Sequence, residues 1–91
     1  MLNLQRVTMF VAVVDAGSFT AAAAALGQTK AVVSFNVRQL ESELGVTLLL
    51  RSTRRLTLTE AGAVFYQRGV GLLKAAENLQ DEVRASHAGV S

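Results

Sequence analysis

Apolar positions in the first half of the chain recur every three or four residues, which is the spacing of one buried face on an α-helix. The first such segment predicts a helix over Leu4–Ala16, with its buried face formed by Leu4, Val7, Val11 and Val14. Residues 19–26 contain five consecutive alanines, the strongest helix former, and predict a second, shorter helix. A third helix is predicted over Lys30–Leu44, with Val33, Val37, Leu40 and Leu44 inward.

Glycine and hydroxyl residues mark the ends of these helices, because the chain contains no proline. Gly17, Gly27 and Gly45 follow the three predicted helices, where a left-handed residue ends a helix most easily. Ser18 and Thr29 stand at the N-cap positions of the second and third helices.

The periodicity changes after residue 45. Alternating leucine and threonine over residues 47–51 and 56–58, around a polar tip, predicts a small β-hairpin. Thr59 and Glu60 then open a long helix over residues 60–86. The small and polar residues that end the chain predict a flexible tail over 87–91.

Composition limits the possible functions. Ninety-one residues provide one hydrophobic core, and the longest apolar run has six residues, far short of a membrane span. The chain has no cysteine and a single histidine, His87, in the predicted tail. We therefore expect no metal site, no cofactor, no catalytic residues, no membrane partner and a cytoplasmic location.

Positive charge is concentrated in the middle of the chain. Residues 28–55 contain five basic and two acidic residues, whereas the whole chain has nine basic and seven acidic residues. Such a cluster is typical of a polyanion binder, although a solvated surface with chance clustering remains the alternative.

The second and third helices have the spacing of a helix-turn-helix unit. Ala23 allows a close helix crossing, Gly27 allows a sharp turn, and Val33 fills the angle between the helices. An ordinary helical hairpin remains the alternative from spacing alone. The outward side chains of the third helix are Lys30, Ala31, Ser34, Phe35 and Arg38, which suit contacts with bases and phosphates in a major groove.

The predicted hairpin adds a second basic surface. Arg51, Arg54 and Arg55 surround its tip, where arginine suits a narrow minor groove, and Ser52 and Thr53 can bind phosphate. An arginine pair in a hairpin is otherwise a common device of a soluble sheet edge.

Three motifs together resemble the N-terminal domain of LysR-type transcriptional regulators. They are Phe10-Val-Ala-Val-Val-Asp-Ala-Gly-Ser-Phe-Thr-Ala-Ala-Ala, Arg38-Gln-Leu-Glu-Ser-Glu-Leu-Gly-Val and Arg51-Ser-Thr-Arg-Arg-Leu-Thr-Leu-Thr-Glu-Ala-Gly. The resemblance covers about residues 3–85 and implies a mainly α winged helix-turn-helix domain over 1–59, followed by a linker helix over 60–86. It also implies a dimeric, promoter-binding transcription factor.

The resemblance yields one expected set of DNA-binding residues. The set is Ser18, Thr29, Lys30, Ala31, Ser34, Phe35, Arg38, Arg51, Ser52, Thr53, Arg54 and Arg55. Three of these depart from the family pattern. The family commonly has glutamine where this chain has Lys30, and proline or serine where it has Ala31. It commonly has a basic residue where this chain has Phe35. We therefore expect the docking mode, more than any inherited target sequence, to be shared.

The long helix also predicts a dimer. Phe65, Gly69, Leu72, Ala76, Leu79 and Val83 are separated by alternating steps of four and three, which is a coiled-coil seam with one glycine in it. We expect Phe65, Leu72, Ala76, Leu79 and Val83 to contact a second copy of the chain, with packing wholly on its own domain as the alternative. A higher oligomer is left open for a full-length protein.

LysR-type regulators usually carry a longer C-terminal effector-binding domain, so any small-molecule effector is expected to act through a domain that these residues do not include. The alternative to a DNA-binding regulator is a helical interaction module that dimerises through 60–86 without binding DNA.

Overall fold

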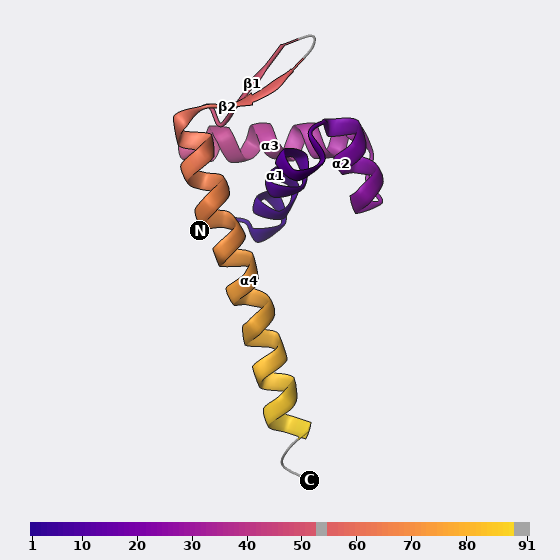
Figure 1. The fold of residues 1–91 in the computed structure, drawn as a ribbon, viewed down its shortest axis with the longest axis vertical. Coiled ribbons are helices and arrows are strands. Elements are labelled where there is room, and N and C mark those ends of the chain that lie inside the picture. The colour runs from indigo at the N-terminus through magenta and orange to yellow at the C-terminus, as the bar shows by residue number, and fades with distance from the viewer. Residues whose placement is uncertain (53–54, 89–91) are drawn as a thin grey trace.

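The computed structural model describes residues 1–52 and 55–88, which form four helices and one two-stranded antiparallel sheet (Figure 1). The elements in chain order are α1 (Leu4–Ala16), α2 (Phe19–Leu26), α3 (Lys30–Leu44), β1 (Leu49–Arg51), β2 (Leu56–Leu58) and α4 (Glu60–Ala88). The mainly α fold class, with three helices, a hairpin and a long fourth helix, is therefore confirmed.

Local capping fixes the helix-turn-helix unit as the sequence predicts. The Ser18 hydroxyl accepts a hydrogen bond from the Ala21 amide at 3.0 Å, and the Thr29 hydroxyl accepts one from the Val32 amide at 3.1 Å. Gly27, between α2 and α3, has φ 66°, a conformation that costs glycine little and other residues more. The predicted bounds of all three helices are confirmed.

The core lies where α1 crosses α2 and α3. Its largest fully buried side chains are Phe10, Leu40, Leu48, Val7, Val13, Val33 and Val37. The prediction that Leu4 and Leu44 are buried is wrong, because both are exposed in the end turns of their helices. The buried face of α1 is also wider than predicted and includes Phe10 and Val13, since α2, α3 and α4 all contact this helix.

The β1–β2 hairpin, called the wing below, stands away from the helices beside α3 (Figure 1). Its register pairs Leu49 with Leu58 and Arg51 with Leu56. The first strand is shorter than the predicted 47–51. The main chain at Thr47 and Leu48 instead binds Thr59, whose amide lies 3.0 Å from the Leu48 carbonyl oxygen.

Helix α4 packs on α1 through its first half, and its second half extends away from the domain (Figure 1). The Phe65 ring meets Phe10 edge-on with centroids 5.4 Å apart, and the Tyr66 hydroxyl donates a hydrogen bond to Asp15. This bond, with a smaller effect of burial, raises the pKa of Tyr66. Gly69 forms a close helix crossing, because an added Cβ there would lie 3.3 Å from Val7.

The C-terminal end of α4 lies further along the chain than predicted. The helix continues to Ala88, so residues 87 and 88 are helical, and residues 89–91 lie outside the described part. Within the described residues, none of the helices is long and apolar enough to cross a membrane.

Candidate nucleic-acid interface

One side of α3 faces away from the core and combines basic with apolar side chains. Val33, Val37 and Leu40 are buried on the inner side. Lys30, Ala31, Phe35 and Arg38 are exposed, and we call these four residues the outer face of α3. Phe35 is 57% exposed, an unusual position for a phenylalanine beside two cations.

The two carboxylates of α3 are turned away from this outer face and are used inside the domain. Glu41 accepts hydrogen bonds from the Leu48 and Leu49 amides, at 2.7 and 3.2 Å, and so ties the start of the wing to α3. Glu43 forms an ion pair with Arg6 of α1. The charge on the outer face is therefore positive. All residues of α3 are described, and neither of its two carboxylates is free beside this face.

Arg51, one of the predicted DNA contacts, is partly buried against other elements of the domain. Its guanidinium lies 4.7 Å from the Phe19 ring centre, 3.7 Å from Glu41 Oε1, and 3.5 Å from the Ser34 hydroxyl. Its Nη2 atom is buried. Burial and, secondarily, repulsion by Arg38 lower the pKa of Arg51, whereas Glu41 raises it. Arg51 therefore holds the wing against α2 and α3 in the free protein, and its DNA contact stays a prediction.

Ser34 is also partly withdrawn from the outer face. It is half-buried, and its hydroxyl accepts the weak hydrogen bond from Arg51. Lys30, Ser34 and Arg38 are four residues apart on α3 and so share one side of the helix, as predicted, but Ser34 is less exposed than the other two because it lies beside Arg51 of the wing.

A shallow groove brings four of the expected residues together: Ser18, Lys30, Ser52 and Arg55. It runs between the start of α2, the start of α3 and the wing, and it is lined by Gly17, Ser18, Phe19, Thr20, Lys30, Ser52, Arg55 and Leu56. Ser18 and Thr29 serve as N-caps, yet each hydroxyl keeps a proton that it can donate to a phosphate. The expected contacts of Thr53 and Arg54 lie outside the described residues.

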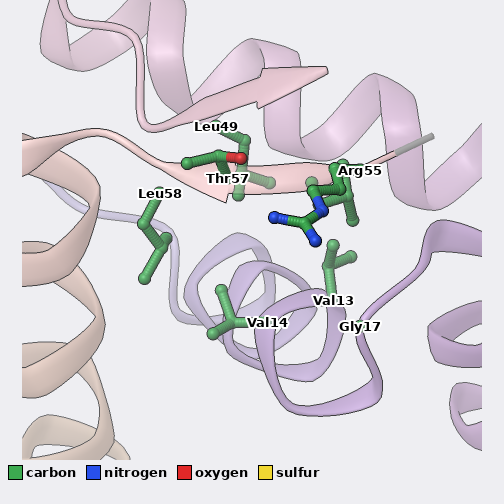
Figure 2. Close-up of a pocket in the computed structure, with 8 residues that line it drawn as sticks. Val13, Val14, Gly17, Leu49, Arg55, Thr57 and Leu58 are labelled. Carbon is green, nitrogen blue, oxygen red and sulfur yellow. The ribbon is translucent and has the colours of Figure 1, made fainter. Parts of the chain in front are cut away.

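Arg55 reaches back beneath the wing. Figure 2 shows its guanidinium pointing into the hollow between the two strands and the end of α1, above Val13 and Gly17. Its backbone amide is fixed by the Ser52 hydroxyl at 3.1 Å, whereas its side chain is exposed. A minor-groove contact would require this side chain to turn outward.

The predicted dimer residues divide into two groups. Leu72, Leu79 and Val83 are 41%, 62% and 61% exposed on α4, and Ala76 lies between them. Phe65 instead packs on Phe10 and so belongs partly to the chain's own core. We call Leu72, Ala76, Leu79 and Val83 the exposed stripe of α4.

Two apolar hollows flank Phe65 and Arg68 on α4. The first is lined by Leu2, Phe65, Arg68, Gly69 and Leu72. The second is lined by Leu44, Val46, Leu48, Ala61, Val64, Phe65 and Arg68. Sequence reasoning missed Val46 and Val64 here and had assigned Leu44 to the core. The helical spacing of Ala61, Val64, Arg68 and Leu72 was the available signal.

The contact between Glu41 and the wing gives a stability prediction. Glu41→Gln keeps an acceptor oxygen but removes the charge that faces two amides and Arg51, so we expect the free energy of unfolding to fall by about 1–2 kcal/mol. Urea unfolding followed by circular dichroism measures the change. The matched control is Glu77→Gln, on an exposed position of α4. Equal effects of the two substitutions would contradict the anchoring role.

Comparison with known proteins gives a consistent result. Residues 4–63 match the family model described as bacterial regulatory helix-turn-helix protein, lysR family. The HTH-type transcriptional regulator PtxR of Pseudomonas aeruginosa is 49% identical over 78 residues, covering 82% of this chain and 25% of that protein. The chain thus spans about a quarter of the length of this relative.

Solved structures of DNA-binding domains have the same fold. The BenM domain in complex with catB site 1 DNA has a TM-score of 0.92 and 34% identity, covering 94% of this chain and 97% of that one. The CbnR domain in complex with DNA has a TM-score of 0.89 and 34% identity, covering 94% and 99%.

Proposed function

The chain belongs to the lysR family of bacterial regulatory helix-turn-helix proteins, and from this premise we propose that it binds double-stranded promoter DNA sequence-specifically to regulate transcription. The observation that carries this proposal is the outer face of α3, which presents Lys30 and Arg38 while both carboxylates of α3 are engaged elsewhere. We propose residues 1–59 as the DNA-binding unit and α4 as the dimerisation helix. A cytoplasmic location follows from a promoter partner.

The proposed docking mode follows from the arrangement of α3 and the wing. The N-terminal half of α3 enters the major groove, where Lys30 contacts guanine or a phosphate and Arg38 contacts the backbone. The wing tip, with Arg54 and Arg55, then lies against the backbone or the adjacent minor groove. The TM-scores to DNA-bound BenM and CbnR domains support this mode. The proposal includes no catalytic step.

DNA binding is tested by the salt dependence of affinity and by one charge substitution. We expect the logarithm of the binding constant to fall linearly with the logarithm of salt concentration, with a slope of about −0.9 per phosphate neutralised. Lys30→Ala should weaken specific binding by about 1–3 kcal/mol if Lys30 reads a base, and should weaken all sequences alike if it contacts phosphate. Fluorescence anisotropy with labelled duplexes measures both quantities.

The matched control for this experiment is Lys74→Ala, which removes the same charge from an exposed position on α4. Equal affinities of the two variants would refute the role of Lys30. Failure of the unmodified chain to bind any duplex at low salt would refute the proposed function and favour a helical interaction module.

We further propose that two copies pair through antiparallel α4 helices. Leu79 and Val83 of the exposed stripe are 62% and 61% exposed, and the second half of α4, which carries them, extends away from the domain (Figure 1). A second copy offers both an identical stripe and the two apolar hollows beside Phe65. Antiparallel pairing places the C-terminal half of one helix along the N-terminal half of the other.

The seam specifies its own register. If Phe65 lies opposite Val83 of a second copy, then Gly69 lies opposite Leu79, and Leu72 opposite Ala76. Each pair thereby joins a larger residue to a smaller one, and Leu79 enters the hollow lined by Leu2, Gly69 and Leu72. A two-fold symmetric dimer then presents two α3 helices to two half-sites.

A further inference from the structure

We propose that Phe35, together with Ala31, recognises thymine through its 5-methyl group, so that each half-site carries a thymine whose methyl packs on the Phe35 ring. This inference rests on the proposed function and specifies which feature of the DNA the outer face of α3 reads.

The first observation is the exposure of an aromatic ring that has no role inside the domain. The other three phenylalanines pack within the protein: Phe10 is fully buried, Phe19 is 9% exposed, and Phe65 stacks edge-on against Phe10. Phe35 is 57% exposed. Phe35 adjoins the exposed Ala31 and Val32 on α3, and contiguous exposed apolar surface of this kind is typical of a binding site.

The second observation is the position of Ala31, one helical turn before Phe35 on the same outer face. The small Ala31 side chain allows a partner to approach the helix backbone there. The Phe35 ring stands beside this position, so a group bound over Ala31 would contact the ring. Ala31 and Phe35 thus form an apolar surface, with Lys30 before it and Arg38 after it along the helix.

Those flanking charges identify the occupant. A protein that bound the apolar surface of Ala31 and Phe35 would also have to accommodate the positive charges of Lys30 and Arg38. The carboxylates of α3 do not neutralise these charges, because Glu41 binds the wing and Glu43 binds Arg6. Duplex DNA supplies phosphates for the cations. In its major groove, thymine presents the only apolar group among the four bases, the C5-methyl.

The third observation is that hydrogen-bonding capacity near the centre of α3 is reduced. Ser34 is half-buried and accepts the Arg51 hydrogen bond, and the Asn36 amide nitrogen donates to the Val32 carbonyl oxygen at 2.8 Å. Asn36 also accepts a hydrogen bond from Arg6. Ala31 and Phe35 carry no hydrogen-bonding group on their side chains, so packing against methyl groups is the readout available to them.

The experiment begins with duplexes selected by the unmodified chain from random DNA. Each thymine of the selected site is then replaced singly by deoxyuridine, which removes only the methyl group and keeps every hydrogen-bonding atom. We expect at least one thymine per half-site at which this change weakens binding about fourfold, the effect of exposing one methyl.

The same duplexes are then titrated with three variants. Phe35→Ala should bind the thymine and deoxyuridine forms equally at that position, whereas Phe35→Leu, which keeps an apolar group, should retain part of the difference. Val70→Ala, which shortens an exposed apolar residue of α4, should retain all of it. Circular dichroism of each variant verifies folding.

The outcomes separate this inference from the proposed function. Salt-dependent binding in which every deoxyuridine is neutral overturns methyl recognition and leaves DNA binding intact. A deoxyuridine effect that persists unchanged in Phe35→Ala assigns the methyl contact to another residue and also overturns the inference. If no duplex is selected, the proposed function fails, and methyl recognition fails with it.

Discussion

Replacing Gly62 with alanine is expected to lower the free energy of unfolding by about 3 kcal/mol or more, at the upper end of the effects of overpacking. A Cβ at this position would overlap the carbonyl oxygen of Leu48 and would lie 3.0 Å from its carbonyl carbon and 3.1 Å from Leu58 Cδ2. The Leu48 carbonyl is held in place, since it accepts the Thr59 amide at 3.0 Å. The first turn of α4 must therefore move away from the wing.

Gly71 provides a control within the same helix. An added Cβ there meets no atom within 4 Å, so Gly71→Ala should stabilise the protein by up to about 1 kcal/mol through helix propensity. Both variants are compared by urea unfolding at one fixed protein concentration, because pairing of chains contributes to apparent stability. Similar stabilities of Gly62→Ala and Gly71→Ala would contradict the prediction, because they would show that the Leu48 carbonyl group can move away from a Cβ at position 62 at little cost.

The Gly62 contact also gives a physical reason for the Thr-Glu-Ala-Gly motif that follows the wing and opens α4. The Thr59 hydroxyl accepts a hydrogen bond from the Gly62 amide at 2.9 Å and donates one to the Thr47 carbonyl oxygen at 2.7 Å. Thr59 thus caps α4 and closes the base of the wing, while Gly62 allows the approach. The cap was predictable from sequence because it is local, whereas the contact with Leu48 joins segments that are distant in sequence.

The same distinction explains which helix ends and buried residues could be predicted. Ser18 and Thr29 bind amides three residues ahead, so a few residues of sequence determine the start of α2 and α3. Whether Leu44 is buried depends instead on how far the neighbouring helices extend beside α3. Periodicity identifies a buried face and does not show where along the helix that face ends.

The partial burial of Arg51 could have been predicted from the alternation of side chains along its strand. Side chains two apart on a strand share a face, so Arg51 lies on the same face as the buried Leu49, with the exposed Leu50 opposite. Alternation along the strand therefore indicated an inward arginine. The basic character of the hairpin led to the opposite expectation, because the Phe19 ring and Glu41 that receive Arg51 come from other elements.

The apolar residues of α4 form one continuous pattern in the sequence but have different surroundings in the structure. Its apolar spacing runs unbroken from Phe65 to Val83, yet Phe65 and Gly69 pack on α1 whereas Leu79 and Val83 are exposed. The sequence correctly predicts one continuous apolar stripe. It does not show that the N-terminal end of α1 lies beside the middle of α4, so that Phe65 and Gly69 also pack on α1 while Leu79 and Val83 remain exposed.

The exposed stripe gives the last prediction: Leu79→Asp combined with Val83→Asp should convert dimers to monomers and weaken binding to a duplex with two half-sites at least 100-fold. Linking two binding modules raises overall affinity by about 10²–10⁴-fold without any new DNA contact, and this gain disappears when the helices separate. Sedimentation velocity measures the oligomeric state, and titration of one-half-site and two-half-site duplexes measures the loss.

The control is Val70→Asp, which places one aspartate at an exposed position of α4 away from the exposed stripe and should leave dimers intact. On a duplex with one half-site, the double variant and the unmodified chain should have similar affinity per protomer, because α3 and the wing lie in the domain and not on the distal half of α4 (Figure 1). A double variant that stays dimeric would place the interface elsewhere. A monomeric double variant with full affinity for the duplex with two half-sites would show that pairing through α4 does not contribute to DNA affinity.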